Sequence, residues 1–351
     1  MRPILFVGVA VVAFVAACGG SSSTVMITPN PTSKVVLTPP PPTERPPVAS
    51  STRVAPTITV EGPCNDPYLN GAPYEPIPGT PIQILPHGAP EPLRPFQFEL
   101  PQPDAALARV VRESVGDLVD HFSVLVKNLD DGTGMVLDPD RDFYAASLYK
   151  TWVMLEAFAQ HEDGLLDWSE LYVVSQYYEA FGLNPGELRE CDVVALGDVL
   201  DRMMGRTDNV AANILLERVG AGNINRSLRN LGLDLSGFYV EGTLPTTARE
   251  AALLLEAIYE QAAVSEEASA RMLELLKTES IDNRIPALLP LDTEVAHKTG
   301  NWQDATHDAG IVFSPNTTYI IVALTDFGYT DGGATPIAEL SLAVYNYYND
   351  T

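Results

Sequence analysis

The hydrophobic positions along the chain change their spacing several times after residue 103. Apolar residues three and four apart predict a helix over residues 104–119, and Asp104 is suited to cap its first turn. Two short strand-like runs follow at 122–129 and 134–137. The sequence Asp130-Asp131-Gly132 between them is typical of the tight turn of a β-hairpin. The pattern therefore predicts a helix followed by two antiparallel strands.

A largely helical stretch comes next, with predicted helices at 147–160, 168–178, 192–204, 208–219, 222–231, 247–262 and 265–278. Strand patterns then return, and a closing helix ends the chain; these elements are predicted at 294–300, 308–313, 318–324 and 334–348. This order predicts an α+β fold. We expect an antiparallel five-stranded sheet flanked by helices, with an all-helical subdomain at about 147–262 inserted midway.

The first residues predict where the protein is located. Arg2 precedes an apolar run at 4–15, which is too short to remain as a bilayer span. The end of this run, Ala16-Ala17-Cys18, resembles the cleavage site of a bacterial lipoprotein, and an ordinary signal peptide is the alternative. We therefore expect residues 1–17 to be removed and Cys18 to be lipidated. The protein is then exported, extracytoplasmic and held on a bacterial membrane through this lipid alone.

The composition of residues 18–103 changes along the segment and divides it into two parts. Residues 18–60 are rich in Ser, Thr and Pro, which predicts a disordered stalk. Residues 61–103 stay rich in proline but add large apolar side chains, so we expect an extension that packs on the folded domain. The domain itself is predicted at 104–351. Cys64 in the extension and Cys191 in the domain form a candidate disulfide, and two separate thiols are the alternative.

The charge of the chain limits its partners. It has 21 basic and 46 acidic side chains, a formal charge of −25, and the acidic residues are spread along it. Such a chain repels nucleic acid, and the even spread is typical of a solubilising surface. The 5 histidines show no zinc-site spacing. We expect no nucleic-acid partner, no metal, no cofactor, and a monomer.

Ser147 and Lys150 are the first candidates for chemistry. They open an apolar helical run and, at positions i and i+3, lie on one face of the predicted helix. A lysine that burial keeps partly neutral can take the proton of a serine hydroxyl, and a helix N-terminus supplies N–H groups for an oxyanion. A helix-capping serine followed by a solvated lysine is the alternative.

Two further triplets follow in the chain. Thr207-Asp208-Asn209 begins a predicted helix, where Thr207 can act as the cap, and Lys298-Thr299-Gly300 ends a predicted strand. Each triplet alone has a purely structural interpretation. His307-Asp308 also leaves a Ser-His-Asp triad open, although two ordinary strand residues are the simpler interpretation.

Taken in order, Ser147-x-x-Lys150, Thr207-Asp208-Asn209 and Lys298-Thr299-Gly300 resemble the three active-site elements of class A β-lactamase-like serine hydrolases, the β-lactamase and penicillin-binding protein superfamily. The resemblance covers about residues 105–350 and implies a β-lactamase/transpeptidase-like fold. It implies that Ser147 is the nucleophile, that Lys150 is the general base or its relay, and that Thr207 passes a proton to the leaving nitrogen.

The resemblance also implies the binding groups. The N–H groups of Ser147 and Asn301 are expected to form the oxyanion hole. Asn209 is expected to hold the amide of the substrate side chain and to orient Lys150. The resemblance assigns the substrate carboxylate to Lys298 and Thr299, and Gly300 is expected to let the strand approach the substrate closely.

One element of the family departs from its usual form. The Glu-x-x-Leu-Asn loop, whose glutamate activates the deacylating water, has its nearest match in Glu241-Gly242-Thr243-Leu244-Pro245. Glu241 is either that base or a solvated loop acid.

The leading hypothesis is a serine hydrolase that cleaves a β-lactam or related amide through an acyl-enzyme. The alternatives are a D,D-peptidase or penicillin-interacting hydrolase of cell-wall peptides that deacylates slowly, and a non-catalytic cell-surface binding domain.

Overall fold

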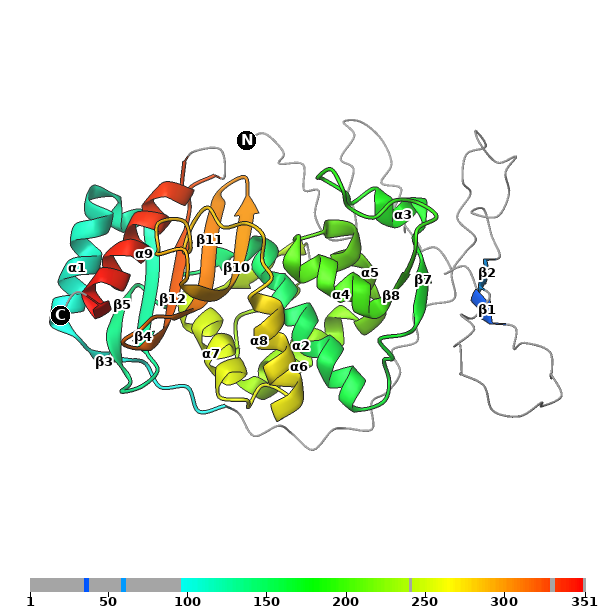
Figure 1. Cartoon of the computed structure of the whole chain (residues 1–351), viewed down its shortest axis with the longest axis horizontal. Coiled ribbons are helices and arrows are strands. Elements are labelled where there is room, and N and C mark those ends of the chain that lie inside the picture. Colours follow the sequence, from blue (N-terminus) through cyan, green and yellow to red (C-terminus); the bar gives the residue numbers. More distant parts are fainter. Residues whose placement is uncertain (1–34, 38–57, 61–95, 240–241, 329–331, 350–351) are drawn as a thin grey trace, which may run out of the picture.

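The computed structural model describes residues 35–37, 58–60, 96–239, 242–328 and 332–349 (Figure 1). Strands β1 (Val35–Leu37) and β2 (Ile58–Val60) pair antiparallel with each other. The predicted signal peptide, Cys18, Cys64 and Glu241 lie outside the described residues. The expectations for them therefore stay predictions.

A single large sheet organises the part of the chain from residue 96 onward. Its strand order is β10-β11-β12-β4-β5-β3. The five long strands are all antiparallel, as predicted, and run over Glu294–Trp302 (β10), Ala305–Phe313 (β11), Thr318–Thr325 (β12), Phe122–Asn128 (β4) and Thr133–Leu137 (β5). The short strand β3 (Gln102–Pro103) adds a parallel edge next to β5. The α+β prediction is thus confirmed.

Helices cover both faces of this sheet. One face carries α1 (Ala105–Val115) and α9 (Ala334–Asn349), and the other carries α7 (Ala248–Tyr259) and the helical block (Figure 1). Every residue of β4 is buried because the strand is covered on both sides. Asp104 caps α1 as predicted, since its side chain accepts from the N–H groups of Ala106 and Leu107 at 2.9 and 3.1 Å. The helix ends at Val115, and a 3₁₀ turn, η2 (Gly116–His121), leads into β4.

The helical block is built around α2 (Tyr149–Glu162). Helices α4, α5, α6 and α8 surround it, at Leu196–Gly205, Asn209–Val219, Ala221–Leu231 and Glu266–Leu276. Most side chains of α2 are buried whichever way they point, which is typical of a helix enclosed on all sides. The start of α2 is consequently held between the block and the sheet, where a site can be formed.

The predicted helix at 168–178 is wrong. Strand β7 (Leu171–Val173) pairs antiparallel with β8 (Val193–Ala195), and only the short helix α3 (Gln176–Glu179) follows. Three-residue strands are too short to show a two-residue period, so the pairing between distant segments decided the outcome. The helix predicted at 192–204 begins at Leu196 for the same reason.

Cys191 lies in the turn that precedes β8, has φ of 70°, and takes part in a disulfide. The other two cysteines, Cys18 and Cys64, lie outside the described residues. The pairing of Cys191 with Cys64 therefore stays a prediction.

The described end of the extension, residues 96–103, is packed on the domain. Phe96 and Phe98 contact the larger hydrophobic core, and the Phe96 N–H donates to the Leu231 carbonyl at 3.2 Å. Lys127 donates to the Glu99 carbonyl at 2.8 Å and to the Glu256 carboxylate at 2.7 Å. These contacts fasten the segment to the end of α6 and to β4, and Lys127 in turn links β4 to α7.

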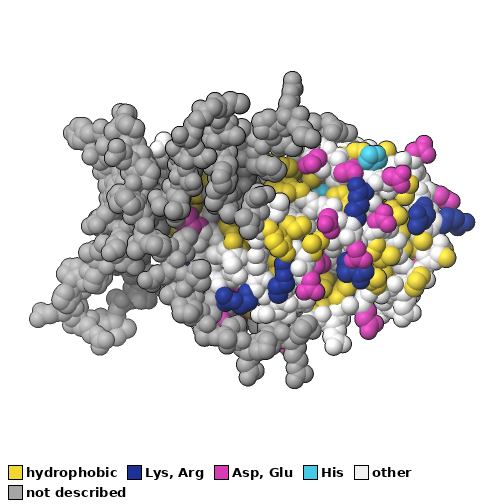
Figure 2. All heavy atoms as spheres, turned by 180° about the vertical axis from the view of Figure 1, so that it is seen from behind, with side chains coloured by type: hydrophobic (Ala, Val, Ile, Leu, Met, Phe, Trp, Pro, Cys, Tyr) yellow, Lys and Arg dark blue, Asp and Glu magenta, His cyan; other side chains and the backbone are white. Residues whose placement is uncertain are grey.

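On the described part of the face in Figure 2, acidic and basic side chains are interspersed. Among the described helices, none combines the length and the apolar character that a bilayer crossing requires.

Candidate active site

Ser147 lies in the 3₁₀ turn η3 (Ala146–Leu148), immediately before α2 begins at Tyr149. The predicted helix start at 147 is therefore two residues early. Ala146 has φ of 48°, a left-handed conformation that costs an alanine free energy and turns the chain sharply before the serine. The Ala145 N–H donates to the Leu244 carbonyl at 2.7 Å, which holds the turn in place.

A cleft of about 750 Å³ opens over Ser147. The helical block and the sheet both contribute to its walls, which include Tyr144, Ser147, Tyr149, Phe181, Asn184, Arg206, Thr207, Asn209, Asn213, Ile281, Thr299, Asn301 and Trp302. The rings of Tyr144 and Trp302 lie 5.7 Å apart and form an aromatic part of the wall. This volume suits a small-molecule ligand.

Lys150 is completely buried beneath the cleft. Its Nζ donates to the Thr207 carbonyl at 2.6 Å, to Thr207 Oγ1 at 3.1 Å and to Asn209 Oδ1 at 3.0 Å. Burial lowers the pKa of Lys150 to about 7, and the charge of Lys298 adds to this effect. An amine with this pKa is neutral often enough at neutral pH to accept a proton.

Thr207 holds its carbonyl against Lys150 in a strained conformation. Its φ is 52°, which is uncommon for a β-branched residue and costs roughly 1–3 kcal/mol. The prediction that Thr207 caps the next helix is wrong: Asp208 is the cap of α5, and its side chain accepts from the Ala211 N–H at 2.9 Å. Because Asp208 takes the capping role, the Thr207 hydroxyl is left to face the amine of Lys150.

Glu187 positions Asn209 from behind. One carboxylate oxygen accepts from the backbone N–H and from the side-chain amide of Asn209, both at 2.8 Å. The other oxygen accepts from the N–H groups of Leu183 and Asn184 at 2.5 and 2.9 Å. These bonds orient the Asn209 amide so that its oxygen points at Lys150.

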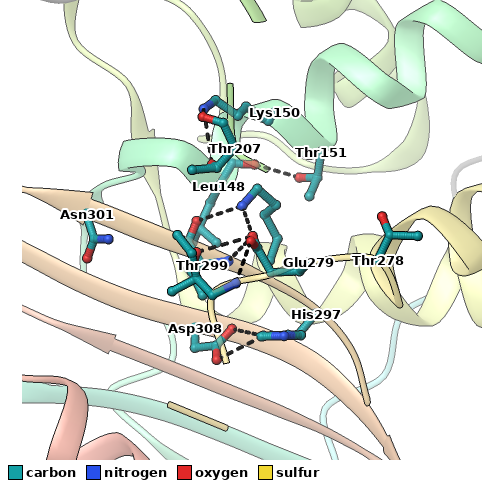
Figure 3. Close-up of polar contacts among 12 residues, drawn as sticks. Leu148, Lys150, Thr151, Thr207, Thr278, Glu279, His297, Thr299, Asn301 and Asp308 are labelled. Carbon is teal, nitrogen blue, oxygen red and sulfur yellow. Dashed lines mark hydrogen bonds and ion pairs between the residues drawn. The ribbon is translucent and has the colours of Figure 1, made fainter. Parts of the chain in front are cut away.

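The sheet side of the site contains a second buried lysine with a different partner. Lys298 on β10 forms an ion pair with Glu279, and both side chains are almost fully buried. Thr299 Oγ1 donates to the same carboxylate oxygen at 3.2 Å. Figure 3 shows Glu279 and Thr299 pointing toward each other, with Lys150 and Thr207 on one side of them. Burial opposes ionisation of Glu279, but the charge and hydrogen bond of Lys298 outweigh it and hold the pKa of Glu279 below its usual value.

His307 and Asp308 do not form a triad with Ser147. His307 Nε2 lies 2.9 Å from the Tyr144 carbonyl, and its Nδ1 accepts from the Thr325 N–H at 3.1 Å. Burial lowers the pKa of His307 to about 4, so the ring is neutral and both nitrogens are used. Asp308 instead bonds the buried His297 at 2.9 Å (Figure 3).

A family model described as "Beta-lactamase enzyme family" matches residues 103–348. The chain belongs to this beta-lactamase enzyme family. Comparison with curated proteins finds no matching sequence.

Solved structures place the fold of this beta-lactamase family member among known ones. PBP-A is 23% identical, with 73% of this chain and 100% of that chain covered and a TM-score of 0.66. A β-lactamase from Sphaerobacter thermophilus is 20% identical, with 70% and 97% covered and a TM-score of 0.63. A representative of class A β-lactamase from Bacteroides cellulosilyticus is 22% identical, with 70% and 99% covered and a TM-score of 0.62. The predicted β-lactamase/transpeptidase-like fold is confirmed.

In this beta-lactamase family fold, most of the site residues expected from the sequence come together. Five of them line the cleft, namely Ser147, Thr207, Asn209, Thr299 and Asn301. Gly300 lies behind it, where a Cβ would approach the Ala145 carbonyl to 3.1 Å, so the close approach is to the turn before Ser147. Lys150 and Lys298 are buried beneath the cleft wall.

Sequence analysis missed three charged residues of this beta-lactamase family site, Glu187, Glu279 and Arg284. Arg284 is buried and donates to the His307 carbonyl at 2.9 Å and to Asn301 Oδ1. All three lie in loops, where no period distinguishes a buried charge from a solvated one. Among the described residues that line the cleft, none is acidic, and the described residues contain no cluster that could hold a metal ion.

Proposed function

We propose that this chain is a serine hydrolase of the class A β-lactamase type, which hydrolyses a β-lactam or a related amide through an acyl-enzyme on Ser147. The observation that carries the proposal is the buried Lys150. Its pKa is lowered to about 7, and it lies directly beneath the cleft that Ser147 lines. A solvated lysine on a helix surface, the structural alternative, would be exposed.

Acylation follows from these groups. Neutral Lys150 takes the Ser147 proton, the serine oxygen bonds to the carbonyl carbon, and charge develops on the carbonyl oxygen. The N–H groups of Ser147 and Asn301 stabilise that charge. The carbon–nitrogen bond then breaks, and the leaving nitrogen receives the proton from Lys150 through the hydroxyl of Thr207. The hydrogen bond between Lys150 and Thr207, 3.1 Å long, supports this route.

Deacylation distinguishes the leading proposal from its runner-up. Since the described cleft residues include no acid, a water-activating base has to come from elsewhere, and Glu241 is the candidate from the sequence. If Glu241 does not act, the acyl group leaves slowly, as expected for a D,D-peptidase or a penicillin-interacting hydrolase. A solved structure with this fold is a PBP-A mutant described as an acyl-enzyme complex with penicillin-G.

The test is time-resolved mass spectrometry of the full chain mixed with a chromogenic cephalosporin. Turnover with a transient adduct on Ser147 supports the β-lactamase proposal, and Glu241→Gln should then trap the adduct. A persistent stoichiometric adduct supports the runner-up. Ser147→Ala should remove the adduct, whereas Ser169→Ala, at a serine bonded to the exposed Asp167, should not.

Absence of adduct and turnover, both with the cephalosporin and with an uncharged acyl donor, would overturn both enzymatic proposals. It would favour a non-catalytic binding domain, provided that cell-wall fragments still bind to the Ser147→Ala variant.

We also propose that the protein is an exported, monomeric lipoprotein, and that it meets the membrane only through lipid on Cys18. The N-terminal sequence supports this proposal. Cys18→Ala should move the protein from the membrane fraction to the soluble fraction in a bacterial host. Retention of this variant in the membrane fraction would contradict the lipid anchor.

A further inference from the structure

The family resemblance assigns Lys298 and Thr299 to the carboxylate of the substrate. In this chain, however, both residues already bind the carboxylate of Glu279. The Lys298 amine pairs with Glu279, and the Thr299 hydroxyl donates its one proton to the same oxygen at 3.2 Å. The Thr299 N–H lies 3.5 Å from that oxygen as well. Glu279 thus occupies the donors that a substrate anion would need.

The position of Glu279 is firmly fixed. Its second oxygen accepts from the Ile281 N–H at 3.1 Å, and its side chain has no exposed surface. The neighbouring Ser280 N–H donates to the Gly205 carbonyl at 2.9 Å, which ties this loop to the end of α4. Swinging Glu279 away without another anion in its place would leave Lys298 as an unpaired buried charge, which is strongly unfavourable.

A second carboxylate beside Glu279 would therefore be unfavourable. Two carboxylates that share one site cannot both stay ionised cheaply, so one of them has to take up a proton. The other buried cation here, Arg284, lies behind Asn301 and is near the buried Asp308. Beneath Lys298 and Thr299 the buried charges are thus already paired, and the cation that lines the cleft nearby, Arg206, is exposed to solvent.

We propose that Glu279 is a specificity-determining residue: it stands in for the substrate carboxylate, so that this site favours substrates that carry an uncharged group next to Lys298 and Thr299. The inference rests on the proposed acyl-enzyme function. The substrate class is a neutral ester or amide, such as an amidated or esterified acyl donor, and free acids are disfavoured.

The test compares two acyl donors that differ by one charge, 3-carboxyphenyl phenylacetate and its methyl ester. The full chain should show a kcat/KM for the methyl ester at least tenfold above that for the acid. Glu279→Gln frees Lys298, so the acid-to-ester ratio of kcat/KM should rise at least tenfold. A tenfold change corresponds to about 1.4 kcal/mol. A purely structural role for Glu279 would change both substrates alike and leave this ratio where it was.

The variant Glu279→Gln contains an unpaired buried lysine and can fail to fold for that reason. A second variant keeps the inference testable in that case. Glu279→Gln/Lys298→Gln removes both charges, so its preference for the ester over the acid should fall severalfold below that of the wild type. A wild-type preference for the acid, or ratios that neither variant changes, would overturn the inference.

Failure of the proposed function gives a different result. If neither ester acylates Ser147, the acyl-enzyme proposal fails. The inference about Glu279 is then decided by calorimetry with the matched amides, 3-(phenylacetamido)benzoate and its methyl ester, on the Ser147→Ala background. Tighter binding of the methyl ester, reversed by Glu279→Gln, supports the role of Glu279. Tighter binding of the acid contradicts it.

Discussion

The two buried lysines of the cleft, Lys150 on the helical side and Lys298 on the sheet side, differ in what their amines contact. Lys150 donates to uncharged oxygens of Thr207 and Asn209, whereas Lys298 pairs with the carboxylate of Glu279. Burial, with the charge of Lys298 added to it, lowers the pKa of Lys150 to about 7, because no carboxylate among the described residues is bonded to its amine to offset the effect. The comparison teaches that the partner of a buried lysine differs between the two walls: uncharged oxygens surround Lys150, the proposed proton acceptor, and a carboxylate pairs with Lys298.

The largest effect should come from removing the proton acceptor. Lys150→Met is expected to slow acylation of Ser147 by about 10²–10⁴-fold, because a positioned general base contributes on that scale. In the wild type, the acylation rate should rise with pH through about 7, since only neutral Lys150 accepts a proton. Stopped-flow measurement of adduct formation checks the loss of rate in Lys150→Met and the pH dependence of the wild type. The range of pH 5.5–9 is chosen to bracket the pKa of Lys150.

A matched control for this prediction is Lys277→Met. Lys277 is paired with Glu274 and Glu294 and does not line the cleft, so its loss should leave the acylation rate and its pH midpoint in place. An unchanged rate in Lys150→Met would contradict the assignment of the base.

The next effect tests how Asn209 is held. In Glu187→Gln, the amide can no longer accept from all four N–H donors, so the free energy of unfolding should fall by about 1–3 kcal/mol. Loss of the Glu187 charge should also lower the pKa of Lys150, which moves the pH midpoint of acylation downward. Denaturant unfolding and the pH profile are the measurements.

Glu179→Gln is the control, because Glu179 accepts from a backbone N–H in the same region but lies outside the cleft lining. It should not move the pH midpoint. A midpoint that stays fixed in Glu187→Gln would show that Glu187 does not act on Lys150.

A smaller effect is expected from the helix cap beside the site. Asp208→Ala should lower the free energy of unfolding by about 1–2 kcal/mol and slow acylation, because the cap positions Thr207 and Asn209. Asp104→Ala removes the cap of α1 on the opposite face and should cost similar stability with no loss of activity. Equal activity losses in the two variants would mean that the cap does not position the site.

The last prediction concerns the slope of stability with pH. The pKa of Lys150 in the fold is about 7, whereas a lysine in the unfolded chain has about 10.4, so the unfolded state binds more protons between these values. The free energy of unfolding should therefore rise with pH across this window, by at most about 1.4 kcal/mol per pH unit. Lys150→Met should remove this contribution to the slope, and a slope equal to that of the wild type would contradict it.

Local patterns predicted the elements whose signals are local. The cap at Asp104, the β4–β5 hairpin and the three C-terminal strands follow from residue spacing and turn composition. The strand pair β7–β8 was missed because its stability comes from a partner about 20 residues away rather than from its own sequence.

The candidate site, like the fold, was predictable only where its residues have a recognisable local spacing. Ser147, Lys150, Thr207 and Asn209 are linked by recognisable spacing, and they converge on one cleft. Glu279 could not be found in this way, because its role depends on a loop that brings it against Lys298. The sequence alone therefore predicted the groups that are proposed to react and missed a group proposed to select the substrate.

The strap at residues 96–103 has a mechanical consequence. Its attachments come in series along the chain: Phe96 to Leu231, Glu99 to Lys127, and Gln102 to Gly132 at 2.9 Å. A pulling force transmitted from the N-terminal side would load the bond to α6 first, then the bond to Lys127 in β4, and then the bond to Gly132. This segment can thus detach from the domain in stages, one bond at a time.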